Sequence, residues 1–272
     1  MTTSDAVLYE PASAERPVGI LRLNRPDQRN SMTAELLDAF AVRVVEARKD
    51  AAARAVVVTG SGACFSARRR SARADPAEGR RPDAHAARGE LRHVHSFLSL
   101  LDVEVPVVGA LNGHAVGGGF GLALLCDIRI GATRVGESDA RYGANFARLG
   151  LHSGLGISYV LPRLVGASRA AELLFTGKLV SGSDAAAMGI LSRAVPADEV
   201  LPAALALATD IARAAPIAVR MMKASLRQGL GWDVRQAAWN EAYAQSATIA
   251  THDFQEGMAA LLGKREPVFE GR

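Results

Sequence analysis

The stretch "GHAVGGGFGLALLCD" (residues 113–127) places five glycines around and directly before an apolar run. It follows "VPVVGALN", a continuous apolar segment that predicts a buried strand. The apolar run after the glycines predicts a helix, so the glycine-rich turn joins a strand to a helix. The turn has no carboxylate before Asp127. Any chemistry in the turn itself therefore does not come from an acidic side chain.

Two phosphate-binding motifs do not fit this turn. A Walker loop requires a lysine six residues after its first glycine, and counting from Gly113 reaches Gly119. A dinucleotide-binding fingerprint requires a third glycine where this chain has Leu122 or Leu124, depending on the first glycine chosen. The sequence excludes both motifs.

Two interpretations of the glycines remain open. The first N–H groups of a helix have no intrahelical partner and carry the positive end of the helix dipole, so they can bind a carbonyl oxygen that gains negative charge. Glycine also allows a helix and a strand to pack closely without any ligand. Sequence pattern alone favours neither.

Strands and helices alternate on both sides of this turn. The segment 33–50 has helical spacing, with Thr33 as a plausible N-cap. Polar residues predict a long loop over 64–90, and 91–102 is predicted to be helical. Further strands are expected at 18–26, 54–62, 126–132 and 140–144, and further helices at 168–175, from 183, at 198–214, at 216–229 and at 233–262.

This pattern predicts an α/β fold in two parts. Residues 1–195 are expected to form the α/β core, because strands and helices alternate up to that point. Residues 196–272 are expected to form a helical C-terminal region that mediates oligomerisation, because this stretch is nearly all helix in pattern.

Composition limits the classes of partner. The formal net charge is +4, which suits an anionic small molecule, and no nucleic-acid-binding motif is present. The two cysteines are distant in sequence, so no disulfide is expected. No long apolar span and no convincing metal site are present, so neither a membrane anchor nor a metal is expected. The first segment is polar, which predicts a cytoplasmic protein.

The glycine-rich stretch and its flanking strands resemble those of a known family. "VPVVGALNGHAVGGGFGLALLCDIRIGA" resembles the signature stretch of the enoyl-CoA hydratase/isomerase (crotonase) superfamily, and similarity extends from "LNRPDQRNSM" to "FQEGMAALLGKREPVFEGR". The resemblance implies a crotonase-like ββα spiral with a helical C-terminal trimerisation region. It implies an acyl-CoA substrate, no cofactor beyond the coenzyme A of that substrate, and a homotrimer or dimer of trimers.

The resemblance also implies roles for individual residues. The thioester oxygen would lie between the backbone N–H groups of Gly118 and Arg69, the latter in "ARRR" (67–70) where the family usually reads A-G-A-D. The acyl group would contact Ala67, Gly117, Gly121, Tyr142, Asn145 and Phe146. Coenzyme A would contact Arg29, Arg70 and Lys264.

Three acidic positions of the family are empty in this chain. Gly121 and Phe146 occupy the places of the two hydratase glutamates, and Gly154 occupies the place of the isomerase acid. General acid–base groups contribute about 10²–10⁴-fold each, so this chain keeps enolate stabilisation and lacks the usual proton carriers. His152 is the candidate replacement acid or base, with capping or packing as the alternative.

The segment 68–92 holds eight arginines and four acids. It is either a binding surface for the phosphates of coenzyme A or a solvated loop.

We therefore expect an acyl-CoA enzyme of the hydratase/isomerase type, a lyase or an isomerase, which stabilises a thioester enolate. The alternatives are a decarboxylase or C–C hydrolase of the same fold, or a non-catalytic acyl-CoA-binding protein.

Overall fold

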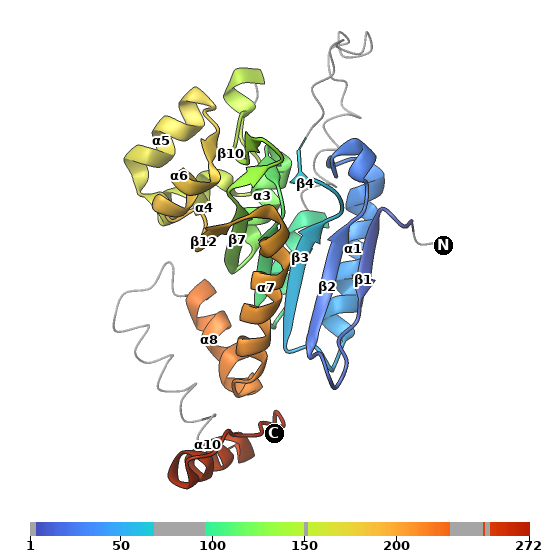
Figure 1. The fold of residues 1–272 in the computed structure, drawn as a ribbon, viewed down its shortest axis with the longest axis vertical. Coiled ribbons are helices and arrows are strands. Elements are labelled where there is room, and N and C mark those ends of the chain that lie inside the picture. Colours follow the sequence, from blue (N-terminus) through green and yellow to red (C-terminus); the bar gives the residue numbers. More distant parts are fainter. Residues whose placement is uncertain (1–3, 68–95, 150–151, 229–246, 248–250) are drawn as a thin grey trace.

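A six-stranded sheet forms the centre of the molecule in the computed structural model, which describes residues 4–67, 96–149, 152–228, 247 and 251–272 (Figure 1). Its strand order is β1-β2-β3-β5-β7-β12, with only β1 antiparallel to its neighbour. The apolar runs seen in the sequence become its central parallel strands, as expected for a sheet covered on both faces. The strands are Val7–Glu10, Val18–Leu23, Ala55–Gly60, Val107–Leu111, Ile128–Ala132 and Arg193–Val195, respectively.

A second, smaller sheet begins where the main strands end. It has the order β11-β10-β6-β4, and β6 is parallel to both β10 and β4. These strands are Val180–Ser181, Arg141–Gly143, His114–Val116 and Cys64–Ser66. The segment from 64 was expected to be loop, but its first three residues form β4 because they pair with β6.

A separate hairpin lies in the chain between β7 of the main sheet and β10 of the smaller sheet. Strands β8 (Arg134–Val135) and β9 (Ser138–Asp139) pair antiparallel. Glu137 and Asp139 are exposed there, which fits their polar character.

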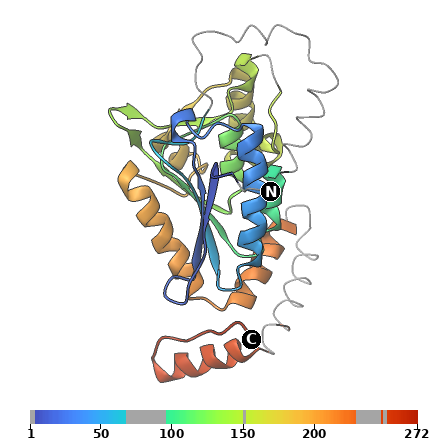
Figure 2. The same ribbon diagram turned by 90° about the vertical axis from the view of Figure 1, so that its right-hand side faces the viewer.

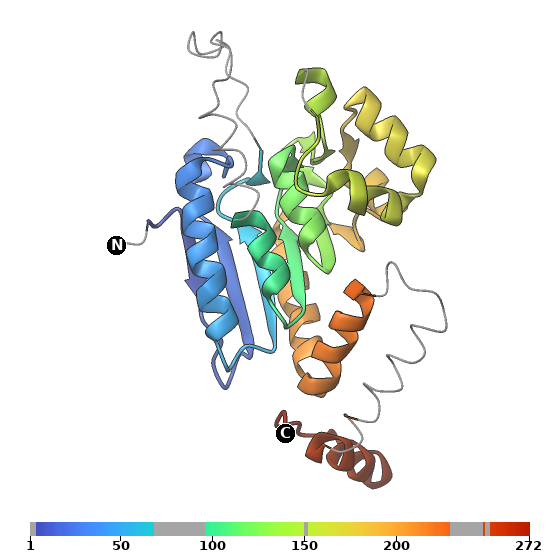
Figure 3. The ribbon, with the colours of Figure 1, turned by 180° about the vertical axis from the view of Figure 1, so that it is seen from behind.

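Helices cover both faces of the main sheet. Helix α1 (Ala34–Lys49) begins after Thr33, whose side chain accepts the N–H of Leu36 as the sequence predicted. It packs on β1, β2 and the short helix η3 (Ser99–Asp102). Helix α7 (Ala197–Ala212) packs on β3, β5 and β7 from the other face (Figures 2 and 3). Helix α7 buries Val200 and three alanines, whereas α1 buries leucines and Phe40.

Helix α7 belongs to the stretch after residue 195 that was expected to form a helical C-terminal region, and it packs into the core. Its residues Val200, Ala204, Ala208 and Ala212 are buried in the same hydrophobic core as the strands. The core therefore extends to about residue 212. Helix α8 (Pro216–Gln228) is attached to that core by the buried Lys223, whose Nζ lies 2.8 Å from Asp127 Oδ2.

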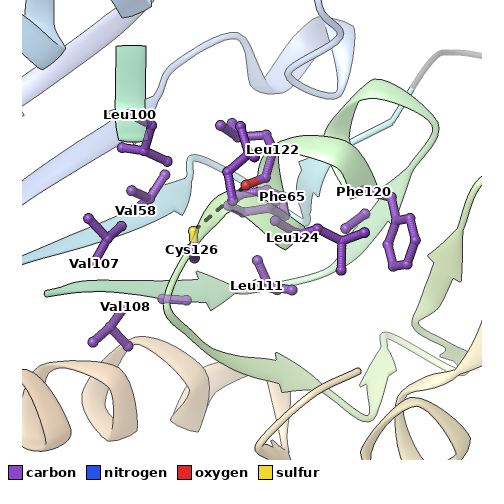
Figure 4. Close-up of a cluster of buried hydrophobic side chains, with 14 of the residues drawn as sticks. Val58, Phe65, Leu100, Val107, Val108, Leu111, Phe120, Leu122, Leu124 and Cys126 are labelled. Atoms are coloured by element: carbon purple, nitrogen blue, oxygen red, sulfur yellow. Dashed lines mark hydrogen bonds between the residues drawn. The ribbon is translucent and has the colours of Figure 1, made fainter. Parts of the chain in front are cut away.

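Helix α3 (Gly118–Leu125) lies at the centre of the fold. Seven of its eight residues are buried, from Gly119 to Leu125. Its apolar side chains pack with those of β3 and β5, as the close-up shows (Figure 4). Burial of this helix fixes its first turn, and therefore the glycine-rich stretch, relative to the sheets.

Four more α-helices lie in the described chain. Three of them, α4 to α6, lie near β10 and β12, and α10 lies at the other end of the molecule (Figure 1). Helices α5 and α6 were expected from the sequence, but α4 was not, because glycines precede it and Pro162 interrupts its pattern. Taken singly, no helix of the described residues has the length and apolar character needed to cross a membrane; α7 and α8 reach it only as a pair, bent by 111°. The bounds are Ile157–Val165 (α4), Ala167–Thr176 (α5), Gly182–Ala187 (α6) and His252–Gly263 (α10).

Candidate functional site at the start of helix α3

The glycines of the opening stretch fall into two groups. A Cβ atom on Gly113 would lie 2.2 Å from the carbonyl oxygen of Ala63, and one on Gly119 would lie 2.1 Å from that of Ser66. These two glycines allow close packing against β4. Gly117, Gly118 and Gly121 face other neighbours, so the packing interpretation accounts for only part of the motif.

Gly117 and Gly118 form the start of the helix. Gly117 has φ 62°, in the region that favours glycine, and its N–H donates to Gly143 O at 2.9 Å. Its carbonyl accepts the N–H of Gly121 at 3.0 Å. No described residue accepts a hydrogen bond from the N–H of Gly118, the first residue of α3. This N–H is therefore a candidate donor to a ligand.

Apolar side chains lie beside this donor. The position of a Cβ on Gly118 is 3.2 Å from Met32 Cγ and 3.9 Å from Leu155 Cδ1. The corresponding position on Gly117 is 3.8 Å from Phe146 Cζ. Met32, Phe146 and Leu155 are half-buried and pack against the core. We call these three side chains the apolar wall.

Leu155 fills the space of a side chain at position 121. A Cβ on Gly121 would lie 2.6 Å from Leu155 Cδ1 and 2.8 Å from Leu155 Cβ. Leu155 has φ 59°, a conformation that costs a non-glycine residue about 1–3 kcal/mol. Leu155 therefore occupies the space beside position 121, and the glycine there is what makes room for it.

Asn30 connects β4 to the turn that precedes α1. Its side chain is fully buried; Oδ1 accepts the N–H of Arg25 at 2.7 Å, and Nδ2 donates to Ser61 O at 3.0 Å and to Cys64 O at 2.8 Å. The neighbouring Arg29 O accepts the N–H of Ala67 at 3.0 Å. Asn30 thus holds the strand that leads to the expected second donor.

Replacement of Asn30 by alanine is expected to lower the free energy of unfolding by about 3 kcal/mol or more. The substitution removes the partner of the buried carbonyl of Cys64 and of the partly buried backbone groups of Arg25 and Ser61, and a buried group left unpaired costs about 1–3 kcal/mol. Urea unfolding of the variant measures this loss. The matched control is Asn24→Ala, because Asn24 makes its side-chain bonds in a more exposed position; equal losses for the two variants would contradict the role of Asn30.

Two residues expected at the site from the sequence lie elsewhere. Tyr142 is fully buried and its hydroxyl donates to Ala132 O at 2.9 Å, so burial raises the pKa of this phenol. It packs in the core, which differs from the expected acyl contact. Lys264 follows α10, which lies at the end of the molecule away from α3 (Figure 1). Within one chain the structure does not bring Lys264 to Gly118.

His152 is exposed, and its Nδ1 lies 2.6 Å from Ser153 O. This contact within the local turn is compatible with the capping alternative. The other nearby histidine, His114, is half-buried and its Nδ1 accepts the N–H of Arg141 at 3.0 Å. Burial, followed by the charges of Arg29 and Arg141, lowers the pKa of His114, so this histidine acts as a neutral acceptor between β6 and β10.

The expected second donor, Arg69, and the coenzyme A contact Arg70 lie outside the described residues, as does the rest of the arginine-rich segment after Ala67. Ala67 and Arg29 are brought together by their backbone hydrogen bond, and the Arg29 side chain is exposed. Asn145 lies near Gly117, with Oδ1 3.5 Å from the position of a Cβ there. These contacts place five of the expected residues at the start of α3: Gly117, Gly118, Gly121, Asn145 and Phe146.

The described chain has two thiols and a large cavity that are not part of the candidate site at the start of α3. Cys64 and Cys126 are buried thiols, and burial raises their pKa values to about 11 and about 12. No three metal-ligating side chains come together among the described residues. A cavity of about 840 Å³ lies beside the C-terminal tail, lined in part by Arg54, Arg213 and Phe269, and shares no lining residue with the start of α3.

Comparison with known proteins gives one consistent result. The sequence profile described as enoyl-CoA hydratase/isomerase matches residues 13–272. A crotonyl-CoA hydratase of Syntrophomonas wolfei is 34% identical over 94% of this chain and 95% of its own length. The crystal structure of an enoyl-CoA hydratase from Bacillus anthracis has a TM-score of 0.87 and 31% identity, covering 98% of this chain and 100% of that chain. One from Mycobacterium smegmatis has a TM-score of 0.84 and 27% identity, covering 97% and 98%.

Proposed function

Because the chain belongs to the enoyl-CoA hydratase/isomerase family, we propose that it binds an acyl-CoA and stabilises the enolate of its thioester at the N–H of Gly118. The observation that carries this proposal is the first N–H of α3, for which no described residue is an acceptor. A donor fixed in this way stabilises an oxyanion without moving, which is worth about 10²–10³-fold in rate. The second donor in this proposal is the N–H of Arg69.

The reaction type follows from what the site lacks. Gly121 and Phe146 stand where a hydratase has its two glutamates, and Leu155 occupies the space beside Gly121. Hydration needs a base to activate water and an acid to protonate the α-carbon, and neither glutamate is available. Decarboxylation fits better, because loss of carbon dioxide forms the enolate without a base. Isomerisation and proton exchange need a base other than these two glutamates, for which His152 or the solvent is the candidate. The same absence favours a second candidate, an acyl-CoA-binding protein without turnover.

Coenzyme A binding is expected to be in the micromolar range and to weaken strongly with salt. The exposed Arg29 and the arginine-rich segment 68–92 support this expectation, since arginine pairs well with phosphate and exposed charges are screened by salt. Calorimetry at two salt concentrations measures both quantities. Failure to detect coenzyme A or acetyl-CoA at millimolar ligand would rule out the site.

Proton exchange separates the enzyme from the binding protein. Butyryl-CoA is incubated with the protein in deuterated buffer, and deuterium at the α-carbon is followed by mass spectrometry. Enolate stabilisation predicts incorporation above the protein-free rate. Tight binding without incorporation, and without loss of carbon dioxide from a malonyl-type thioester, would instead identify the non-catalytic candidate.

The state of the protein in the cell is part of the same proposal. A homotrimer or a dimer of trimers in the cytoplasm, formed through the C-terminal helices, is consistent with exposed apolar side chains such as Leu226, Phe254 and Leu262. Light scattering of the full chain gives the number of subunits.

A further inference from the structure

Two parallel strands of the smaller sheet lead directly into the candidate site. Strand β6 ends immediately before Gly117, at the start of α3. Strand β10 ends two residues before Asn145, which Phe146 follows. Gly143 of β10 lies opposite Val116 of β6. The pairing of the two strands therefore sets where the segment after β10 lies relative to the glycine turn.

A side chain extends this pairing at the end of the strands away from the site. His114 is the first residue of β6, and Arg141 is the first residue of β10. The half-buried His114 accepts the N–H of Arg141 at its Nδ1, at 3.0 Å. At the other end of the strands, the N–H of Gly117 donates to Gly143 O at 2.9 Å. The imidazole and the glycine turn thus hold β10 to β6 at opposite ends.

The hydrogen bond requires a neutral imidazole, because a ring nitrogen that carries a proton cannot accept. Two charged side chains of the described residues act on this ring, Arg29 before α1 and Arg141 of β10, and the Arg141 guanidinium lies 3.8 Å from the Asp139 carboxylate. From β4, the thiol of Cys64 donates to His114 O and stays protonated, since burial raises its pKa to about 11. Burial, followed by the two arginines, lowers the pKa of His114 and favours the neutral ring.

We propose that His114 is a positioning residue of the enolate site, whose neutral Nδ1 fixes β10 beside β6 and so keeps the segment Asn145–Phe146 beside the Gly118 donor. This inference rests on the proposed function and adds regulation of the same site by pH. Protonation of His114 removes the acceptor and adds a positive charge next to two arginines. Because the pKa of His114 lies below the ordinary value of 6.5, the hydrogen bond is complete above that pH and is lost as the pH falls below it.

Two variants separate the acceptor from the ring. In His114→Asn the amide oxygen takes the place of Nδ1 and does not titrate, whereas His114→Phe keeps an aromatic ring without an acceptor. At about pH 7.5, α-proton exchange in butyryl-CoA is expected to stay within about 3-fold of wild type in His114→Asn. In His114→Phe it is expected to be about 10-fold slower, since a misplacement of about 1 Å can cost about 10²-fold. His252→Phe, at an exposed histidine of α10, is the control and is expected to retain the wild-type rate.

The pH profile is a readout that a merely structural role would not move. The ratio of the wild-type rate to the His114→Asn rate cancels the base that both proteins share. We expect this ratio to be constant above about pH 7 and to fall below about pH 6.5 toward the ratio of His114→Phe to His114→Asn. Circular dichroism sets the pH range in which all variants are folded. A constant ratio over that whole range overturns the regulation by pH.

A measurement without substrate separates this inference from the proposed function. Hydrogen–deuterium exchange of peptides covering 113–121 and 141–149 is expected to be faster in His114→Phe than in wild type and unchanged in His114→Asn. Equal backbone exchange in His114→Phe and wild type, or equal α-proton exchange rates in the two, overturns the positioning role. If wild-type protein exchanges no α-proton and binds no acyl-CoA, the proposed function falls, and the role of His114 in that site falls with it.

Discussion

Replacement of Gly118 by proline is expected to lower the rate of α-proton exchange in butyryl-CoA by about 10²–10³-fold, which is the contribution of one oxyanion donor. Proline removes the backbone N–H at this position and nothing else of chemical function. Replacement by alanine keeps the N–H and is expected to retain most of the rate. The difference between the two variants isolates the donor that we propose.

The local backbone allows this substitution. Gly118 is the first residue of α3, and proline is well accommodated at the first position of a helix because that N–H has no intrahelical acceptor. Gly117 has ψ −119°, far from the helical values that a following proline disfavours. The ring carbons replace no hydrogen bond within the described chain.

Alanine is the matched control because both variants add a Cβ. That atom would lie 3.2 Å from Met32 Cγ, a contact that the flexible methionine relieves by a small shift. Circular dichroism and thermal unfolding confirm that each variant is folded before rates are compared. Equal exchange rates for folded Gly118→Pro and Gly118→Ala would contradict a role for this N–H.

The sequence predicted the fold well because the fold depends on local patterns and on burial. Continuous apolar runs at 55–60 and 107–111 gave parallel central strands, and Thr33 gave the start of α1. The short strands β1 and β4 were missed. They are only four and three residues long, too short for a clear pattern. Strand β4 also depends on pairing with the distant β6, which no local pattern encodes.

The site was predictable only where backbone geometry defines it. The glycine motif predicted that a helix opens at this turn, and in the structure α3 begins at Gly118. Of the apolar wall, Phe146 was expected at the site from the sequence, whereas Met32 and Leu155 were not. Leu155 lies in "SGLGIS", where nothing in the sequence signals a left-handed leucine, and its contact with Gly121 depends on how α4 packs on α3. Asn30 was missed for the same reason, since its partners lie 31 and 34 residues away.

Hydration of crotonyl-CoA by the wild-type protein is expected to be several orders of magnitude slower than that of an ordinary hydratase. In the function we propose, Gly121 and Phe146 stand at the positions of both hydratase glutamates, and each missing group is worth about 10²–10⁴-fold, although such effects need not multiply. A spectrophotometric hydration assay measures the rate. A turnover near ~10³ per second, fast on the usual enzyme scale, would show that another side chain carries the proton.

Restoring both glutamates is expected to fail unless Leu155 is also removed. In Gly121→Glu with Phe146→Glu, the new Cβ at 121 would lie 2.8 Å from Leu155 Cβ. That atom is next to the backbone and does not swing away, and overpacking of this kind costs about 1–3 kcal/mol. The double variant is therefore expected to be destabilised in urea unfolding and to remain a poor hydratase.

Adding Leu155→Gly to this pair is expected to recover stability and to raise hydration by about 10²-fold or more over wild type, the lower end of what one general acid or base contributes. The glycine vacates the space beside 121 and suits the backbone, since φ at 155 is 59°. Leu155→Gly alone is the control, because it opens the same space without adding an acid and should leave hydration near the wild-type rate. Stability that is no better in the triple variant than in the double variant would show that Leu155 is not the obstacle. A folded triple variant with wild-type hydration would show that positions 121 and 146 do not correspond to those of the hydratase glutamates.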